Sequence, residues 1–161
     1  MIDLKLTSPY ILILTGLPMS GKTFFCKKFF PDTLTISRDE LVMEVAGTRD
    51  YNLAFKTVDQ KAVDKLLVKR ITDAATQKVD VIIDMTNLSK KVRSKNLSYF
   101  SDDYYKVAVV LPILDAAEYK RRNDFRLVNE NKFIPPFVIT NMMNSFVVPT
   151  EDEGFDEIIS V

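Results

Sequence analysis

The sequence contains no histidine and only one cysteine, Cys26. Without histidine, the commonest general base and metal ligand is missing, so any catalytic base must be a carboxylate or a lysine. A single cysteine excludes an internal disulfide framework and suits a reducing cytosol. A Cys/His catalytic pair is also excluded, and Cys26 is interpreted as a small packing residue.

Long apolar runs and an excess of one charge are lacking as well. No stretch approaches the roughly 18 apolar residues of a membrane-spanning helix, and Met1 to Leu6 lacks the apolar centre of a signal peptide. We therefore expect a cytoplasmic protein without a membrane partner. Basic and acidic residues number 22 each, so a nucleic-acid substrate would need a local basic patch rather than an overall positive field.

Apolar runs that alternate with helical periodicity predict an α/β fold with a parallel sheet. The chain shows no repeat, no low-complexity tract and no linker rich in glycine or proline, so residues 1–161 are expected to form one domain. Strands are predicted over 10–14, 33–36, 79–84, 104–111 and 155–161. Helices are predicted over 24–30, 37–47, 57–78, 89–100, 115–128 and 137–146, with capping patterns at Ser37/Glu40, Thr57/Gln60 and Asp115/Glu118.

The segment 16–23 has the sequence GLPMSGKT and matches the phosphate-loop pattern G-x-x-x-x-G-K-[S/T] at each fixed position. A predicted strand precedes it and a predicted helix follows it, so several backbone amides and the helix dipole should face one anion. Lys22 would reach the outer phosphates, and the hydroxyl of Thr23 would hold Mg²⁺. The pattern therefore predicts a nucleoside triphosphate site formed by Gly16, Pro18, Ser20, Gly21, Lys22 and Thr23.

Acidic residues follow two other predicted strands, where a parallel sheet places its ligands. Asp39 lies in the first turn of a helix, where an acid either complements the helix dipole or accepts a proton from a phosphoryl acceptor. Arg38 beside it could bind a phosphate or steady the acceptor. Asp84 ends a strand, either as an ordinary polar terminus or as an acid that supports Mg²⁺ through water or through Thr23.

Thr86 and Asn87 follow Asp84 and could bind an acceptor hydroxyl, although capping of the next helix explains Asn87 about as well. Arg122 and Arg126 share one helix face with spacing four, and they either form a solvated surface or close over a triphosphate. A second basic cluster could contact a nucleic-acid backbone. It consists of Lys90, Lys91, Arg93 and Lys95.

Together these segments resemble the 5′-hydroxyl polynucleotide kinases, both the bacteriophage type and the kinase half of the animal repair enzymes. The matching segments span nearly the whole chain in order, namely GLPMSGKT, SRDE, IIDMTNL, RRNDFR, FIPPFVITNMMNSF and VPTEDEGFDEI. The resemblance implies a P-loop fold similar to adenylate kinase and transfer of the γ-phosphoryl group of ATP to a 5′-OH end of DNA or RNA. A viral member would act in the cytoplasm of its infected host.

The resemblance also implies residue roles. Lys22 and Thr23 would bind phosphates and metal, Asp39 would be the general base, and Arg126, with Arg122 close by, would be the lid arginine. Thr86 would lie near the acceptor. Two departures stand out: phage-type members carry an arginine three residues after the catalytic aspartate, where this chain has Val42, and the chain lacks the D-x-D-G-T motif of a fused 3′-phosphatase.

Two other functions stay open at the level of sequence. A small-molecule kinase of the same fold, acting on a nucleoside, an antibiotic or a sugar nucleotide, is favoured by the neutral net charge and by Val42. A GTPase-type switch is disfavoured because Asn131-Lys132 is not followed by the aspartate of an N-K-x-D segment. An exposed carboxyl-terminal strand or an aromatic-rich helix could pair two chains into a homo-oligomer.

Overall fold

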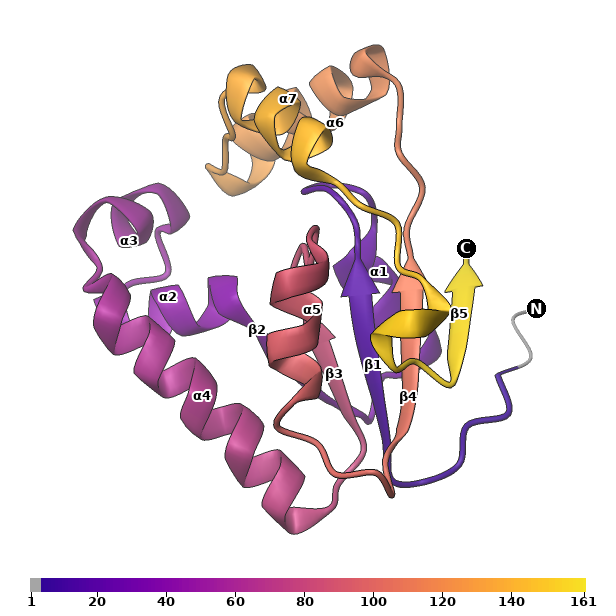
Figure 1. The fold of residues 1–161 in the computed structure, drawn as a ribbon. Helices are drawn as coiled ribbons and strands as arrows, with labels where there is room; N and C mark the ends of the chain where they lie inside the picture. Colours follow the sequence, from indigo (N-terminus) through magenta and orange to yellow (C-terminus); the bar gives the residue numbers. More distant parts are fainter. Residues whose placement is uncertain (1–3) are drawn as a thin grey trace.

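The protein is built on a five-stranded sheet in which every neighbouring pair of strands is parallel (Figure 1). The computed structural model describes residues 4–161, so the first three residues of the Met1 to Leu6 segment lie outside the described range. The strand order is β2-β3-β1-β4-β5, which confirms the predicted α/β fold. The strands are β1 (Tyr10–Thr15), β2 (Leu34–Ser37), β3 (Val81–Asp84), β4 (Tyr105–Val110) and β5 (Glu157–Ser160).

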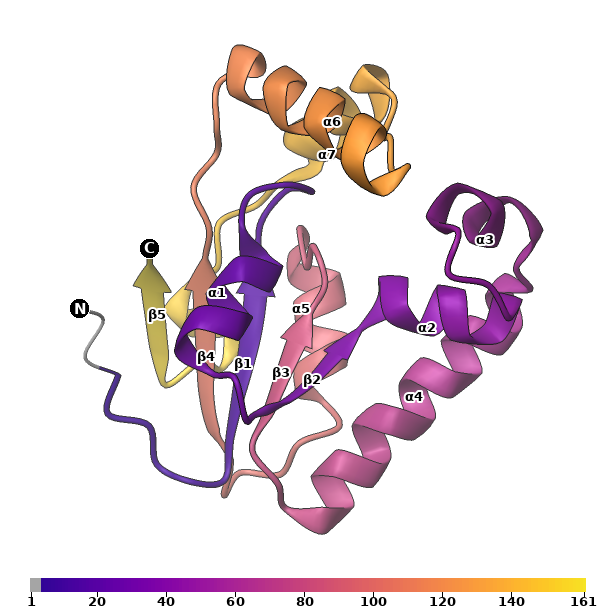
Figure 2. The same cartoon turned by 180° about the vertical axis from the view of Figure 1, so that it is seen from behind.

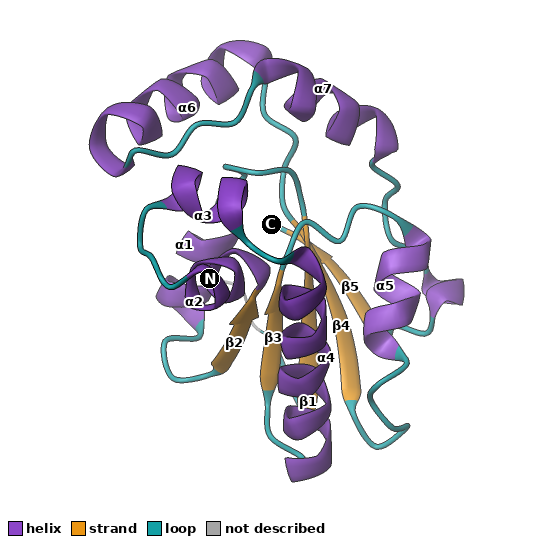
Figure 3. Ribbon diagram, turned by 90° about the vertical axis from the view of Figure 1, so that its left-hand side faces the viewer, coloured by secondary structure: helices purple, strands orange, loops and turns teal. Residues whose placement is uncertain are grey.

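Helices cover both faces of this sheet and its carboxyl end (Figures 1 and 3). Alternating side chains of β1 point to opposite faces: Ile11 and Ile13 pack toward α4 and α5, whereas Leu12 and Leu14 pack toward α1. Helices α6 and α7 lie beyond the carboxyl ends of the strands. The helices are α1 (Lys22–Phe29), α2 (Arg38–Ala46), α3 (Tyr51–Thr57), α4 (Gln60–Gln77), α5 (Lys90–Leu97), α6 (Ala116–Glu130), α7 (Pro136–Ser145) and the short 3₁₀ helix η1 (Glu151–Glu153).

Helix α3 was not predicted, and the helix predicted from residue 57 begins later. Asp50 caps α3 by accepting a hydrogen bond from the backbone of Leu53 at 3.1 Å. Asp59 caps α4, with Oδ1 accepting from the amides of Lys61 and Ala62. Thr57 instead ends α3, because aspartate two positions further on is the stronger cap.

The capping box predicted at Ser37 does not form, although α2 begins at the predicted place. Ser37 makes no side-chain cap, and the carboxylate of Glu40 accepts a hydrogen bond from Arg49 Nη1 at 3.0 Å instead. The cap predicted at Asp115 is present, since its Oδ1 accepts from the amide of Glu118 at 2.8 Å.

Among residues 4–161, none of the helices combines the length and the apolar character needed to span a bilayer.

Candidate active site

The predicted phosphate loop connects β1 to α1 at the carboxyl end of the central strand. Gly16 has no room for a side chain, because a Cβ there would lie 2.7 Å from Ser20 Oγ and 2.9 Å from Leu111 Cβ. Its amide donates to the carbonyl of Thr86 at 3.0 Å, which joins the loop to the end of β3. Pro18 forms the outer turn, and Gly21 has a positive φ of 104° directly before α1. The loop therefore presents the amino end of α1 to a ligand.

Two side chains in this loop carry hydrogen-bond donors that a phosphate could accept from. The hydroxyl of Ser20 is buried and has no hydrogen-bond partner, which costs about 1–3 kcal/mol when uncompensated. Lys22 Nζ donates to the carbonyls of Gly16 at 3.0 Å and Leu17 at 2.7 Å. Burial lowers the pKa of Lys22 to about 8, although the carboxylates of Asp84 and Asp39 raise it. The loop thus fits a phosphate anion in charge and in donors.

Thr23 and Asp84 lie side by side in the structure. The hydroxyl of Thr23 donates to Asp84 Oδ2 at 3.0 Å. Burial raises the pKa of Asp84, while the Thr23 hydrogen bond and the Lys22 charge oppose that rise. A hydroxyl and a carboxylate are the oxygen ligands that Mg²⁺ accepts beside phosphates and water, so this pair fits that ion.

Asp39 and Arg38 are neighbours in sequence but face different surroundings. Asp39 lies at the start of α2, open toward the site, and loss of solvent raises its pKa while Arg126 and Lys132 lower it. Arg38 instead donates to Gln60 Oε1 at 2.8 Å and Asp64 Oδ1 at 3.1 Å on α4. The structure therefore brings Asp39 to the site and holds Arg38 against α4.

Arg122 and Arg126 project from α6 toward the site. We use the name lid for residues 116–134, which comprise α6 and the loop after it. Arg122 donates to the carbonyl of Met19 in the phosphate loop at 2.8 Å and to Glu118 at 2.7 Å. Arg126 lies with its Cζ 5.9 Å from the ring centroid of Tyr51. One arginine thus contacts the loop, and the other lies on the side of Asp39.

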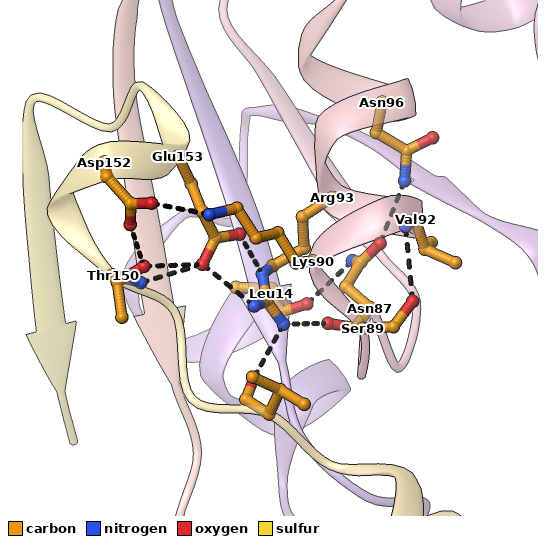
Figure 4. Close-up of polar contacts among 11 residues, drawn as sticks. Leu14, Asn87, Ser89, Lys90, Val92, Arg93, Asn96, Thr150, Asp152 and Glu153 are labelled. Atoms are coloured by element: carbon orange, nitrogen blue, oxygen red, sulfur yellow. Dashed lines mark hydrogen bonds and ion pairs between the residues drawn. The ribbon is translucent and has the colours of Figure 1, made fainter.

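The prediction that the Asn87 side chain contacts an acceptor needs correction. Asn87 is 1% exposed, and its Nδ2 donates to the carbonyl of Leu14 at 2.7 Å (Figure 4). Its Oδ1 accepts from Asn96 at 2.9 Å. The side-chain amide of Asn87 therefore joins the ends of β1 and β3 and is not accessible to an acceptor. Thr86, half-buried, keeps the position beside the loop that its carbonyl contact defines.

The second basic cluster also differs from expectation. Arg93 is fully buried and pairs with Glu153, and Lys90 is held by Asp152 at 2.6 Å (Figure 4). Arg93 therefore cannot contact a nucleic-acid backbone.

The burial of Val42 shows that its position faces the core, not the site.

Tyr51 and Lys132 are the residues that sequence reasoning missed. Burial raises the pKa of Tyr51 to about 12; the charge of Asp39 adds to the rise, and Arg126 opposes it. Lys132 Nζ lies 5.4 Å from the Tyr51 ring centroid. The sequence offers only a weak pattern for α3, namely Asp50 as a helix cap followed by the apolar residues Leu53 and Ala54.

The parallel sheet and its loop define a P-loop kinase fold that binds a nucleotide. The chain belongs to the AAA domain family, whose model matches residues 11–149. A similar curated protein is mouse heterogeneous nuclear ribonucleoprotein U-like protein 2, which is 27% identical over 157 residues. That match covers 92% of this chain and 21% of the mouse protein, so the chain spans about a fifth of the curated relatives it matches.

Solved structures share the fold at low identity. A chain of the Pnkp1/Rnl/Hen1 RNA repair complex matches with a TM-score of 0.70 and 22% identity, over 89% of this chain and 45% of that one. A fungal RNA kinase matches with a TM-score of 0.58 and 17% identity, over 98% and 76%. A gluconokinase from Sinorhizobium meliloti 1021 matches with a TM-score of 0.55 and 12% identity, over 95% and 82%.

Proposed function

We propose that residues 1–161 form a single kinase domain that transfers the γ-phosphoryl group of ATP to a 5′-OH end of DNA or RNA. The observation that carries this proposal is the position of Asp39 at the start of α2, just beyond the carboxyl end of β2, where the positive charges of Arg126 and Lys22 act to lower the pKa of its carboxyl group. A carboxylate there can receive a hydroxyl proton while the loop holds the donor. The structural likeness to an RNA kinase and to an RNA repair complex supports a polynucleotide acceptor.

On the donor side, the amides of the loop and the ammonium of Lys22 would bind the β- and γ-phosphates. Lys22 would exchange its two carbonyl partners for phosphate oxygens. Arg122 and Arg126 would offset the charge that develops as the bond to the leaving ADP breaks. Mg²⁺, held by Thr23 with Asp84 through water, would neutralise phosphate charge.

On the acceptor side, Asp39 would accept the proton of the 5′-hydroxyl as its oxygen forms a bond to the γ-phosphorus. The raised pKa of Asp39 makes its carboxylate a stronger base than an aspartate of ordinary pKa. Thr86 would lie near the acceptor, and Arg38 would act only after leaving Gln60 and Asp64. The products are ADP and a 5′-phosphate end, so atoms and charge balance.

A small-molecule kinase is the second candidate. The neutral net charge and the likeness to a gluconokinase favour it. Such an enzyme would use the same phosphate loop and the same base but would make no contact with nucleotides beyond the reacting sugar.

Transfer of label from γ-labelled ATP tests both candidates. The acceptors are a 5′-OH oligonucleotide, a 3′-nucleotide, a nucleoside and gluconate. The proposal predicts labelled oligonucleotide and 3′-nucleotide; label on the nucleoside or gluconate alone would establish the second candidate instead. Asp39→Asn should lose about 100-fold or more in rate, the range expected for a general base.

Glu40→Gln is the matched control, because Glu40 lies in the same helical turn and pairs with Arg49 outside the site. Equal rates for Asp39→Asn and Glu40→Gln would remove Asp39 from the mechanism.

A further inference from the structure

The carboxyl end of α6 lies beside α3 and near α2, the helix that carries Asp39 (Figure 2). Asn52 Nδ2 donates to the carbonyl of Asn131 at 2.6 Å. Asn131 ends α6 in the left-handed region with φ 50°, and the next amide, that of Lys132, donates to the carbonyl of Arg126 at 3.1 Å. This turn directs Lys132 back toward α3, beside Arg126.

The Tyr51 ring holds two cations next to each other. Lys132 Nζ lies 5.4 Å and Arg126 Cζ 5.9 Å from its centroid. Cation–π contacts of this kind are worth roughly 0.5–2 kcal/mol, enough to offset part of the repulsion between two positive groups. Without the ring, the flexible lysine side chain would have little to keep it at the site.

Lys132 is only loosely paired. Its nearest carboxylate oxygen belongs to Glu130 at 3.7 Å, and Arg126 shares that oxygen at 3.9 Å. Glu130 is 45% exposed, so its attraction is screened by solvent. Within residues 4–161, the Lys132 ammonium makes no hydrogen bond and is free to donate to an incoming anion.

Other cations near the reacting groups are already engaged. Lys22 is bonded to the loop, and Arg122 is bonded to Met19 and Glu118. Arg38 is bonded to α4. Lys132, in contrast, faces the site: its positive charge and that of Arg126 both act to lower the pKa of the Asp39 carboxyl group. Two loosely paired cations therefore remain near Asp39, Arg126 and Lys132, both on the lid. Arg126 is proposed above to act on the phosphoryl group, which leaves Lys132 for an acceptor.

We infer, on the basis of the polynucleotide kinase activity proposed above, that Lys132 binds the phosphodiester on the 3′ side of the first acceptor nucleotide and that Tyr51 is the residue that positions it. A strand whose 5′-hydroxyl reaches Asp39 carries its nearest phosphate one sugar away, whereas a nucleoside carries none. A lysine is suited to this contact because it is a point charge on a flexible stem. The contact gives the site a means of distinguishing a strand end from a free nucleoside.

Steady-state kinetics with Lys132→Ala test this assignment. The acceptors are a 3′-nucleotide and a 5′-OH oligonucleotide, each with ATP as the donor. We expect KM for both acceptors to rise about tenfold, the loss of one charged hydrogen bond, while kcat and the KM for ATP change less than twofold. Added salt should narrow the difference between the variant and the parent protein.

Lys120→Ala is the matched control, since Lys120 also lies on the lid but pairs with Asp124 away from the site. If both lysine variants give the same acceptor KM, or if Lys132→Ala raises the KM for ATP instead, the inference is wrong and the kinase proposal stands. If the parent protein labels neither acceptor, the proposed function itself fails.

Two variants of Tyr51 test its positioning role. Tyr51→Phe keeps the ring and should keep the acceptor KM, whereas Tyr51→Leu should raise it as Lys132→Ala does. Combining Tyr51→Leu with Lys132→Ala should add little, because both changes remove the same contact. A fully additive pair, or an equal loss in Tyr51→Phe, would contradict the positioning role.

Discussion

Arg93 and Glu153 form a buried ion pair with two contacts, Nε to Oε1 at 2.8 Å and Nη2 to Oε2 at 3.0 Å (Figure 4). Their side chains are 0% and 1% exposed. Arg93 also donates to the carbonyls of Asn87 and Val147. The pair therefore fastens the segment after the lid to α5 and to the end of β3.

Breaking this pair should destabilise the protein strongly. Arg93→Met leaves the Glu153 carboxylate buried without its partner, and we expect a loss of about 3–5 kcal/mol in the free energy of unfolding. Chemical denaturation measures it. The double variant Arg93→Met/Glu153→Leu should recover part of the loss, because no unpaired charge then remains; no recovery would contradict this account.

The same ion pair should make the free energy of unfolding depend on pH in the acidic range. Burial favours the neutral Glu153, but the Arg93 hydrogen bonds prevail and the pKa of Glu153 is lowered. Its contribution to stability is therefore complete above the ordinary glutamate pKa and is lost as pH falls through the lowered folded value. Thermal unfolding from pH 6 downward should show a steeper loss for the parent protein than for the double variant.

Gly16→Ala should weaken both stability and nucleotide binding. The added Cβ collides with Ser20 and Leu111, so we expect a loss of about 1–3 kcal/mol in stability and a loss of nucleotide affinity. Gly47→Ala is the control. Gly47 lies at the end of α2 with a positive φ of 70°, so alanine is also unfavourable there, but no neighbouring atom would collide with the added Cβ. An unchanged nucleotide affinity in Gly16→Ala would contradict the steric argument.

Nucleotide binding should take up protons at mildly alkaline pH. The pKa of Lys22 is about 8 in the free protein, mainly because of burial, so its positive charge is lost above that pH. Phosphate groups would restore the charge and raise this pKa. Calorimetric titration near pH 8.5 in two buffers of different ionisation enthalpy measures the uptake, which Lys22→Met should abolish.

Arg126→Ala should change both the rate and its pH dependence. Loss of a cation near the breaking bond should lower kcat by about 100-fold or more. Activity of the parent should fall as pH drops through the raised pKa of Asp39, because the protonated acid cannot accept a proton. Arg126 lowers that pKa, so the acid limb of the variant should move to higher pH. Arg121→Ala, exposed and bonded to Glu118, should leave both unchanged.

The sequence predicted the parts of the site that follow from strand position. Asp84 comes directly after an apolar run, and residues at the carboxyl edge of a parallel sheet must meet. Tyr51 and Lys132 could not be found this way, because they meet through a short helix and a turn that are distant in sequence. Asn87 was misjudged since a polar residue after a strand has the same pattern whether it faces a ligand or the core.

The hydrogen-bond chain in Figure 4 has a consequence for biosynthesis. It runs from Leu14 in β1 through Asn87 and Arg93 to Glu153 in η1, and so joins segments that are about 140 residues apart in sequence. The phosphate loop is translated well before residue 153, so the support beneath it is complete only after residue 153 has left the ribosome. We therefore expect a bound nucleotide to stabilise the loop most once this support is complete, because a ligand that binds only the folded state shifts the folding equilibrium toward that state.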